Sequence, residues 1–342
     1  MTAETAPFPS AAVIGGGAWG TALGHLMALK GVDTMIWALE PATAASINER
    51  GVNEPFLPGV RLASGLRATD NLGATGGRDA YVFAAPAQHA RAVMTQLKET
   101  APATAPVLLC AKGIERGTGL MLTEVLAEVW PRAAAAVLSG PSFARDVAEG
   151  LPTAVTLASA DAGLARRWAA SLSAPHFRPY LSDDPVGAEL GGAVKNVLAI
   201  AAGAVVGRGL GDSARAALIA RGFAEFSRLA LARGAKVETL SGLSGLGDLI
   251  LTATSPQSRN YSLGLELGRG GRLDDVLGGR NSVTEGVATA PAVLAMAKAA
   301  GIEMPVCAAV AALVSGARGL DEIIASLLAR PLKAEIEPAA RH

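Results

Sequence analysis

Short apolar runs alternate with segments of helical periodicity through the first half of the chain. Apolar runs bounded by Gly, Pro, Asp or Asn are typical of buried strands, and the longer segments between them are typical of helices. We predict strands over residues 11–14, 33–37, 80–85, 107–111, 135–138, 153–157 and 177–181. We predict helices over residues 18–30, 41–50, 87–99 and 119–130, and a short helix that ends at residue 149. This alternation favours an α/β fold with a doubly wound, largely parallel sheet.

The pattern changes after residue 184, where apolar positions recur at helical spacing and β-branched runs become scarce. Long helices are predicted over residues 185–206, 213–233, 287–300 and 305–315. We therefore divide the chain into an N-terminal α/β domain, residues 1–188, and an all-α C-terminal domain, residues 189–342. Residues 53–62, which include Pro55, Pro58 and Gly59, are expected to be irregular, and residues 338–342 are expected to fray.

The composition is that of a folded protein without a charged binding surface. Half of the 342 residues are hydrophobic, and 30 basic residues balance 30 acidic ones. This balance gives no electrostatic case for binding nucleic acid or an anionic membrane. Cys110 and Cys307 lie far apart and are expected to be buried thiols in a reducing compartment. The four histidines have no metal-binding spacing, and we predict no metal site.

The sequence predicts a cytoplasmic protein that does not insert into a membrane. The first ten residues lack the basic and apolar segments of a signal peptide. Polar residues interrupt the two longest apolar stretches before they reach the ~20 residues that a membrane span requires. Lys195 and Asn196 interrupt the first, and Lys298, Glu303 and Pro305 interrupt the second.

A glycine-rich turn follows the first predicted strand. Gly15, Gly17 and Gly20 have the spacing G-x-G-x-x-G, with an apolar strand before them and a helix after them. In such a turn the glycines allow a tight bend, a close approach of the backbone to a pyrophosphate, and close packing of helix against strand. The helix N-terminus then offers N–H groups to the phosphates. We therefore predict that the N-terminal domain is of Rossmann type and binds a dinucleotide.

The end of the second predicted strand bears on which dinucleotide is bound. Glu40 lies 20 residues beyond Gly20, where an acidic side chain typically binds the ribose 2′-hydroxyl of NAD. Leu39 beside it supplies no cation for the 2′-phosphate of NADP. The alternative is that Glu40 only marks a helix start before Pro41. Of NAD(H) and NADP(H), this pattern favours NAD.

Several polar residues in apolar or glycine-rich surroundings are candidates for chemistry. Lys195 lies on an apolar predicted helix, where it either extends to solvent or lines a site that lowers its pKa for proton transfer. Lys112 follows a predicted strand at the edge where open α/β sheets bind ligands. Asp248 is either a helix cap or a site carboxylate. Ser258, Arg259 and Asn260 form either a phosphate cradle or a solvated turn.

Taken with these residues, the chain resembles the bacterial-type sn-glycerol-3-phosphate dehydrogenase family. The resemblance is collinear from residue 11 to residue 328 and is carried by eight short segments. These are residues 15–23, 56–59, 111–115, 139–144, 191–196, 245–249, 258–260 and 284–286. It implies reversible reduction of dihydroxyacetone phosphate to sn-glycerol 3-phosphate by a nicotinamide cofactor, feeding glycerophospholipid synthesis, and it implies a homodimer.

The resemblance also implies roles for individual residues. Lys195 falls on the family's proton acceptor, and Lys112 on a residue that contacts both cofactor and substrate; with Asp248 they form the expected catalytic group. The other implied substrate-binding residues are Gly140, Ser142, Asp248, Ser258, Arg259 and Asn260. The other implied cofactor-binding residues are Ala18, Trp19, Ala144, Arg259, Val283 and Glu285. Many family members carry Arg or His where this chain has Leu39, which again favours NAD.

Two other functions remain open at this point. A 3-hydroxyacid or 6-phosphogluconate dehydrogenase shares the glycine turn, a helical second domain and a catalytic lysine. A non-catalytic dinucleotide sensor would keep the nucleotide domain and would be expected to lose Lys195 or Asp248, both of which are present.

Overall fold

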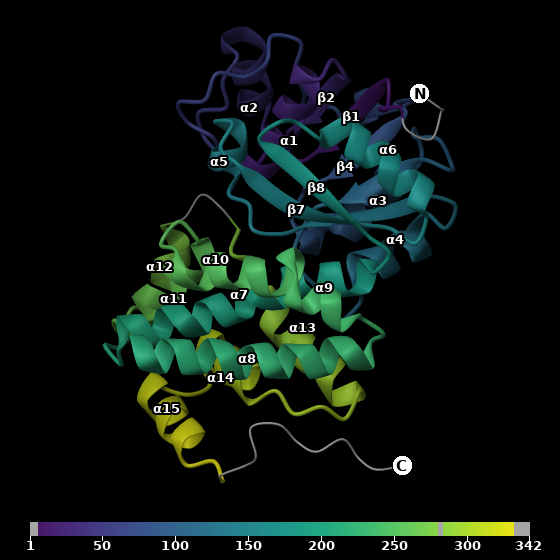
Figure 1. Ribbon diagram of the computed structural model, residues 1–342. Coiled ribbons are helices and arrows are strands. Elements are labelled where there is room, and N and C mark those ends of the chain that lie inside the picture. Colours follow the sequence, from purple (N-terminus) through teal and green to yellow (C-terminus); the bar gives the residue numbers. More distant parts are fainter. Residues whose placement is uncertain (1–5, 280–282, 332–342) are drawn as a thin grey trace.

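The N-terminal domain is built on one eight-stranded sheet. The computed structural model describes residues 6–279 and 283–331, so the predicted frayed tail lies outside the described residues (Figure 1). The strands, in chain order, are β1 Ser10–Ile14, β2 Asp33–Trp37, β3 Arg67–Thr69, β4 Ala80–Phe83, β5 Pro106–Leu109, β6 Ala134–Ser139, β7 Thr153–Ala158 and β8 Phe177–Ser182. Their order across the sheet is β3-β2-β1-β4-β5-β6-β7-β8. Every neighbouring pair is parallel except β6 and β7.

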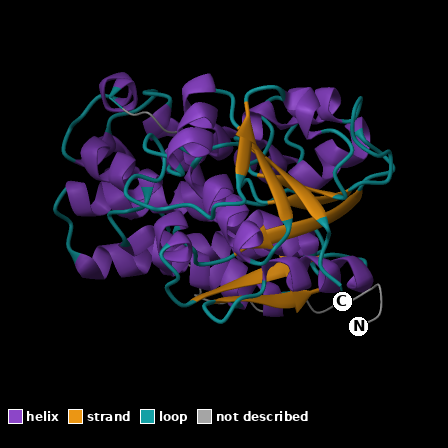
Figure 2. Ribbon diagram, turned by 90° about the horizontal axis from the view of Figure 1, so that it is seen from above, coloured by secondary structure: helices purple, strands orange, loops and turns teal. Residues whose placement is uncertain are grey.

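Helices cover both faces of this sheet (Figure 2). The α-helices are α1 Ala18–Leu29, α2 Pro41–Ala45, α3 Ala90–Leu97, α4 Leu122–Val129, α5 Ala144–Ala148 and α6 Ala162–Leu172. Short helical segments are η2 Ser46–Arg50, η3 Leu72–Thr75 and η4 Ala87–His89. In β1, Ala11 and Val13 pack into the core beneath α1, α5 and α6, whereas Ala12 and Ile14 pack into the core beneath α3 and α4. Both faces of the strand are buried, which explains its uninterrupted apolar sequence.

The strand order reverses between β1 and β4, and the glycine turn lies at that point. After β1 the chain runs outward through β2 and β3, then returns to pair β4 with the other side of β1. A Cβ on Gly15 would lie 2.7 Å from the backbone nitrogen of Ala85, so the turn packs directly against the end of β4. In open α/β sheets, ligands bind in the crevice outside the strand ends at such a switch point.

The fold class is confirmed, and three elements of this domain were missed: β3, α6 and the short η3. The strand β3 has only three residues and begins with Arg67, so its sequence lacks an apolar run. Its pairing with β2, which places Ile36 opposite Ala68, makes it a strand. The helix α6 follows Asp161, whose carboxylate accepts hydrogen bonds from the N–H groups of Gly163 and Leu164. An aspartate at this position is a common N-cap, so the sequence did indicate the start of α6.

The second domain is a bundle of helices around α7 (Figure 1). Its helices are α7 Pro185–Gly207, α8 Asp212–Ala232, α9 Val237–Ser241, η5 Leu243–Gly247, α10 Asp248–Thr254, α11 Arg259–Gly268, α12 Leu273–Gly278, α13 Glu285–Ala299, α14 Pro305–Val314 and α15 Leu320–Leu328. After β8, the described residues form no strand, as the prediction of an all-α domain requires. The predicted boundary at residue 188 falls in the first turn of α7 and stays a prediction.

The apolar character of α7 comes from its central position. By length and composition it could cross a membrane, so the argument that Lys195 and Asn196 interrupt it too early is wrong. In the structure, 89% of the apolar 18-residue stretch of α7 is buried. The helices α8, α10, α11, α13 and α14 pack around it. A core helix surrounded by other helices is expected to be apolar all round.

A buried carboxylate joins α7 to the N-terminal domain. Glu189 accepts hydrogen bonds from the N–H groups of Leu122 (2.5 Å) and Thr123 (3.1 Å) and from the Thr123 hydroxyl (2.6 Å). These groups form the N-terminus of α4, where a negative charge is favourable. Burial raises the pKa of Glu189 to about 7. The contact fixes the end of the loop that carries Lys112 against the helix that carries Lys195.

Candidate active site

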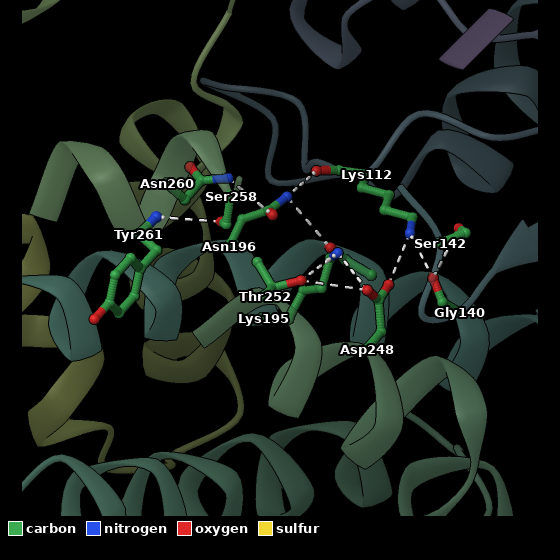
Figure 3. Close-up of polar contacts among 11 residues, drawn as sticks. Lys112, Gly140, Ser142, Lys195, Asn196, Asp248, Thr252, Ser258, Asn260 and Tyr261 are labelled. Atoms are coloured by element: carbon green, nitrogen blue, oxygen red, sulfur yellow. Dashed lines mark hydrogen bonds and ion pairs between the residues drawn. The ribbon is translucent and has the colours of Figure 1, made fainter. Parts of the chain in front are cut away.

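Asp248 lies between two lysines at the junction of the domains (Figure 3). Its Oδ1 accepts a hydrogen bond from Lys195 Nζ at 2.5 Å, and its Oδ2 accepts one from Lys112 Nζ at 2.7 Å. Lys195 also donates to the hydroxyl of Thr252 (2.8 Å), and Lys112 to the carbonyl of Gly140 (3.2 Å). One carboxylate thus connects two ammonium groups from different domains.

Three different elements position the members of this cluster. Lys195 lies in the middle of α7, and Asp248 is the first residue of α10. Thr252 lies one helical turn after Asp248, on the same face of α10. Lys112 follows β5, and its side chain passes over Gly192 of α7. A Cβ on Gly192 would lie 3.2 Å from Lys112 Cγ, so the glycine leaves room for the lysine side chain.

The structure excludes the ordinary structural alternatives for Lys195 and Asp248. Lys195 is 9% exposed, so it does not extend to solvent. Asp248 is 1% exposed, and both of its oxygens bind lysines. The residue at the cap position of α10 is Gly247, so Asp248 is not a helix cap.

Burial and neighbouring charge set the protonation of this cluster. Burial lowers the pKa of Lys195 to about 7; the Asp248 carboxylate opposes this, and the Lys112 ammonium adds to it. Burial alone would raise the pKa of Asp248, but the charges of Lys112 and Lys195 outweigh burial and hold it below its usual value. Near neutral pH, Lys195 can therefore both hold and release a proton beside a permanent carboxylate.

A chain of amide groups continues from Lys112 into the helical domain. Asn196 Nδ2 donates to the Lys112 carbonyl at 3.0 Å, and Asn196 Oδ1 accepts from Asn260 Nδ2 at 2.9 Å. Asn260 Oδ1 accepts from the N–H of Gly286 at 3.0 Å. These contacts join the loop after β5 to α7, α11 and α13.

Other predicted substrate residues lie on both sides of this cluster, Gly140 and Ser142 on one side and Ser258 and Asn260 on the other (Figure 3). The Gly140 carbonyl accepts from the Ser142 hydroxyl (3.1 Å) as well as from Lys112. On the other side, Ser258 is the N-cap of α11 and accepts from the N–H of Tyr261 at 3.2 Å. Arg259 is the first residue of that helix. The segment 258–260 is therefore a helix start facing the cluster through Asn260, not a solvated turn.

The glycine turn has the shape that a dinucleotide pyrophosphate requires. Gly15 has φ +123°, a backbone conformation that side chains disfavour. A Cβ on Gly20 would lie 2.0 Å from the carbonyl oxygen of Gly15, whereas a Cβ on Gly17 would point into open space. No side chain caps the N-terminus of α1, and its first turn holds no acidic residue. The residues present therefore fit the phosphates of a dinucleotide.

Among the other predicted cofactor residues, Trp19 lies within this turn, and Glu285 and Ala144 come from distant parts of the chain. Among the described residues, Trp19 Nε1 and Glu285 Oε2 are buried polar atoms without a hydrogen-bond partner. Glu285 Oε1 accepts from the N–H of Ala87 at 2.9 Å and so joins α13 to the end of β4. Burial raises the pKa of Glu285, and the Ala87 N–H and the Arg259 charge oppose this only in part. Ala144 begins α5.

Two predicted cofactor positions, Val283 and Glu40, are exposed at the surface, and so is Leu39 beside Glu40. Val283 is 45% exposed and Leu39 is 70% exposed. Glu40 precedes Pro41 at the N-cap of α2, yet its side chain makes no capping hydrogen bond. Glu40 therefore does mark a helix start, as the alternative to cofactor binding holds, and its binding of a ribose hydroxyl stays a prediction.

Sequence reasoning did not assign roles to two residues of the cluster. Asn196 was noted only as an interruption of an apolar helix, and Thr252 was not singled out. The readable signal for Thr252 was its spacing of four residues from Asp248, which places both side chains on one helical face.

The fold and the site together define a class of protein. A Rossmann-type domain with a dinucleotide turn is joined to a helical domain, and a buried lysine–carboxylate cluster lies at their junction. This combination defines a two-domain, dinucleotide-dependent oxidoreductase.

Comparison with known proteins gives the family. Residues 10–165 match the profile of the NAD-dependent glycerol-3-phosphate dehydrogenase N-terminus, and residues 184–325 match that of its C-terminus. The chain belongs to the NAD-dependent glycerol-3-phosphate dehydrogenase family. The family resolves the choice between enzymes left open by the sequence, against the 3-hydroxyacid and 6-phosphogluconate dehydrogenases.

The relatives match over almost their whole length. A glycerol-3-phosphate dehydrogenase (NAD(P)+) of Parvibaculum lavamentivorans is 55% identical over 331 residues, covering 97% of this chain and 99% of the relative. One of Rhodospirillum rubrum is 57% identical over 325 residues, covering 95% and 93%. The crystal structure of the Coxiella burnetii glycerol-3-phosphate dehydrogenase superposes with a TM-score of 0.91 at 37% identity, covering 95% of this chain and 99% of that one.

Proposed function

We propose that this protein catalyses the reversible reduction of dihydroxyacetone phosphate to sn-glycerol 3-phosphate with NAD(P)H. The observation that carries the proposal is the cluster of Lys195, Asp248 and Lys112. It places a lysine of lowered pKa at the junction of the nucleotide domain and the helical domain. Family membership supplies the substrate, and glycerophospholipid synthesis is the use we propose for the product.

In the proposed mechanism, Lys195 handles the proton. The glycine turn would hold the phosphates of the dinucleotide, whose dihydronicotinamide would supply a hydride to the substrate carbonyl. Protonated Lys195 donates a proton to the carbonyl oxygen, and in the reverse direction neutral Lys195 accepts it. Lys112 adds positive charge where the oxyanion develops. Asp248 is the positioning residue that holds both ammonium groups, and Thr252 fixes the rotamer of Lys195 through its hydroxyl.

The substrate phosphate is assigned to the start of α11. Arg259 offers paired N–H donors to phosphate oxygens, and Ser258 and Asn260 flank it. Gly140 and Ser142 lie beside Lys112 on the opposite side and are assigned to the polar groups of the substrate. Binding the phosphate at a distance from the carbonyl lets that binding energy orient the reacting carbon.

The test of this function is a spectrophotometric assay of NADH and NADPH oxidation with dihydroxyacetone phosphate. Oxidation that requires this substrate supports the proposal. A 3-hydroxy acid and 6-phosphogluconate serve as controls in the oxidative direction. Binding of NADH without any oxidation would instead identify a dinucleotide sensor.

The rates in the two directions are expected to depend on pH with opposite sign. Because burial lowers the pKa of Lys195 to about 7, the lysine loses its proton as the pH rises through that value. The kcat/KM for reduction, which requires the protonated form, should fall across this range, and that for oxidation should rise. Substrate phosphate ionisation acts on both directions alike. Profiles of the same sign in both directions would refute the assignment of Lys195.

A preference for NAD over NADP is proposed from Leu39 and Glu40. The double substitution Leu39→Arg with Glu40→Ser supplies a guanidinium for the 2′-phosphate and removes a repelling carboxylate. The ratio of kcat/KM for NADPH to that for NADH is expected to rise by about 10- to 100-fold. Leu39→Arg alone should give a smaller rise. A wild-type enzyme that already prefers NADPH strongly would contradict this proposal.

Homodimer formation and a cytoplasmic location are further proposals from the family resemblance. Light scattering on the purified protein tests the first, and cell fractionation tests the second.

A further inference from the structure

A side chain from outside the glycine turn, which has no function in the proposed mechanism, donates a hydrogen bond to the backbone of the turn. Asn53 belongs to the irregular segment 53–62, and it is completely buried. Its Nδ2 donates to the carbonyl of Gly16 at 2.8 Å and to the hydroxyl of Thr21 at 2.7 Å. The Thr21 hydroxyl in turn donates to the same Gly16 carbonyl at 3.3 Å. Three polar groups thus meet beneath the turn.

We propose that Asn53 is a positioning residue for dinucleotide binding, and that it sets the orientation of the peptide unit between Gly16 and Gly17. This inference rests on the proposed binding of a dinucleotide at the turn, but not on the identity of the substrate.

The geometry of the peptide unit gives the reason. In a trans peptide the C=O and the next N–H point in opposite directions, and the described residues contain no cis peptide bond. When Asn53 holds the Gly16 carbonyl, the N–H of Gly17 must therefore point away from Asn53. Gly17 is the N-cap of α1, so this N–H stands at the helix N-terminus that is assigned to the phosphates.

Gly16 is also closely packed against the chain after β2. A Cβ on Gly16 would lie 2.6 Å from the Cβ of Ala38. The segment that carries Asn53 is itself fixed. The N–H of Ala63 donates to His25 Nδ1 of α1 at 2.9 Å, and Arg145 of α5 donates to the Pro58 carbonyl at 2.8 Å.

The chemistry at this position requires a hydrogen-bond donor. The Gly16 carbonyl can only accept hydrogen bonds, so the amide nitrogen of Asn53 must face it. Its oxygen is then left buried, without a hydrogen-bond partner among the described residues. Aspartate has the same shape but no donor, and its charge would repel both the carbonyl and a phosphate.

The test compares two identical substitutions in the same domain. Asn53→Asp removes the two donors beneath the turn. Asn48→Asp is the matched control, because Asn48 also makes two hydrogen bonds, both to the backbone of Ala68 and none to the turn. The dissociation constant of NADH is measured by calorimetry, and kinetic constants are measured with dihydroxyacetone phosphate. Thermal unfolding reports the stability of each variant.

Asn53→Asp is expected to raise the dissociation constant and the KM of NADH by about tenfold or more. The kcat at saturating NADH and the KM of the substrate should stay within about twofold, and Asn48→Asp should leave NADH affinity within about twofold. Wild-type NADH affinity in Asn53→Asp, or equal changes in all constants, overturns the proposal. If this variant does not fold, Thr21→Val should weaken NADH binding about threefold, and unchanged affinity there overturns it. A wild-type protein that binds neither NADH nor NADPH overturns the proposed function as well.

Discussion

Replacing Lys195 by methionine is expected to lower kcat by about 10²- to 10⁴-fold in both directions, because the general acid and base is lost. Methionine has nearly the length of lysine and fills the same space within α7. Asp248 remains paired with Lys112 at 2.7 Å, so the substitution does not leave a buried carboxylate without a counter-charge. Steady-state kinetics with dihydroxyacetone phosphate and with glycerol 3-phosphate measure the loss.

The control for this variant is Lys298→Met, on the exposed last turn of α13. It removes a lysine without touching the cluster and should leave kcat unchanged. NADH affinity should also be unchanged in Lys195→Met, because the glycine turn lies in the other domain. A variant that keeps more than about a tenth of the wild-type kcat would show that another group transfers the proton.

Asp248→Asn is expected to reduce both activity and stability. Without the carboxylate, the ammonium groups of Lys112 and Lys195 face each other with no counter-charge in a buried site. Breaking a buried ion pair by removing one partner typically costs about 3–5 kcal/mol. We expect the lower end of that range, because Lys195 can release its proton. Urea unfolding measures this cost.

The loss of activity in Asp248→Asn should depend on direction and on pH. Removing the negative charge lowers the pKa of Lys195 further, so less of it is protonated near neutral pH. Reduction should therefore lose more than oxidation at neutral pH, and its optimum should move to lower pH. A merely structural defect would reduce both directions equally at every pH.

The matched control is Asp161→Asn at the N-terminus of α6. Asparagine caps a helix as well as aspartate does, so this variant should keep both its stability and its activity. If Asp161→Asn and Asp248→Asn behave alike, the carboxylate of Asp248 has no special function.

Elements whose signal is local were predictable from the sequence. The apolar run Ala11–Ile14 is buried on both faces because it is a central strand of the sheet, and its sequence alone indicates that. The strand β3 was missed for the opposite reason. Its three residues are ordinary, and only pairing with β2 makes them a strand. A strand can be predicted from its sequence when burial requires several consecutive residues to be apolar.

The site was only partly predictable for the same physical reason. The glycine turn is encoded within six residues, and the structure gives it the geometry that the spacing implied. The resemblance marked Lys195, Lys112 and Asp248 as site residues, but the residue pattern alone left Lys195 and Asp248 with ordinary structural alternatives. The hydrogen bonds that exclude those alternatives join residues far apart in the sequence. Lys195 and Asp248 are separated by 53 residues, and Lys112 and Asp248 by 136.

The sequence by itself therefore determined the fold class, the dinucleotide turn and, through resemblance, the family. Spacing within one strand, turn or helix is enough for these, because backbone geometry fixes which neighbouring side chains share a face. Only the tertiary structure decided that Asp248 connects Lys112 to Lys195, that Thr252 completes the contact, and that Asn53 supports the turn. Those contacts depend on how distant elements pack, and so do the burial and charge that lower the pKa of Lys195 to about 7.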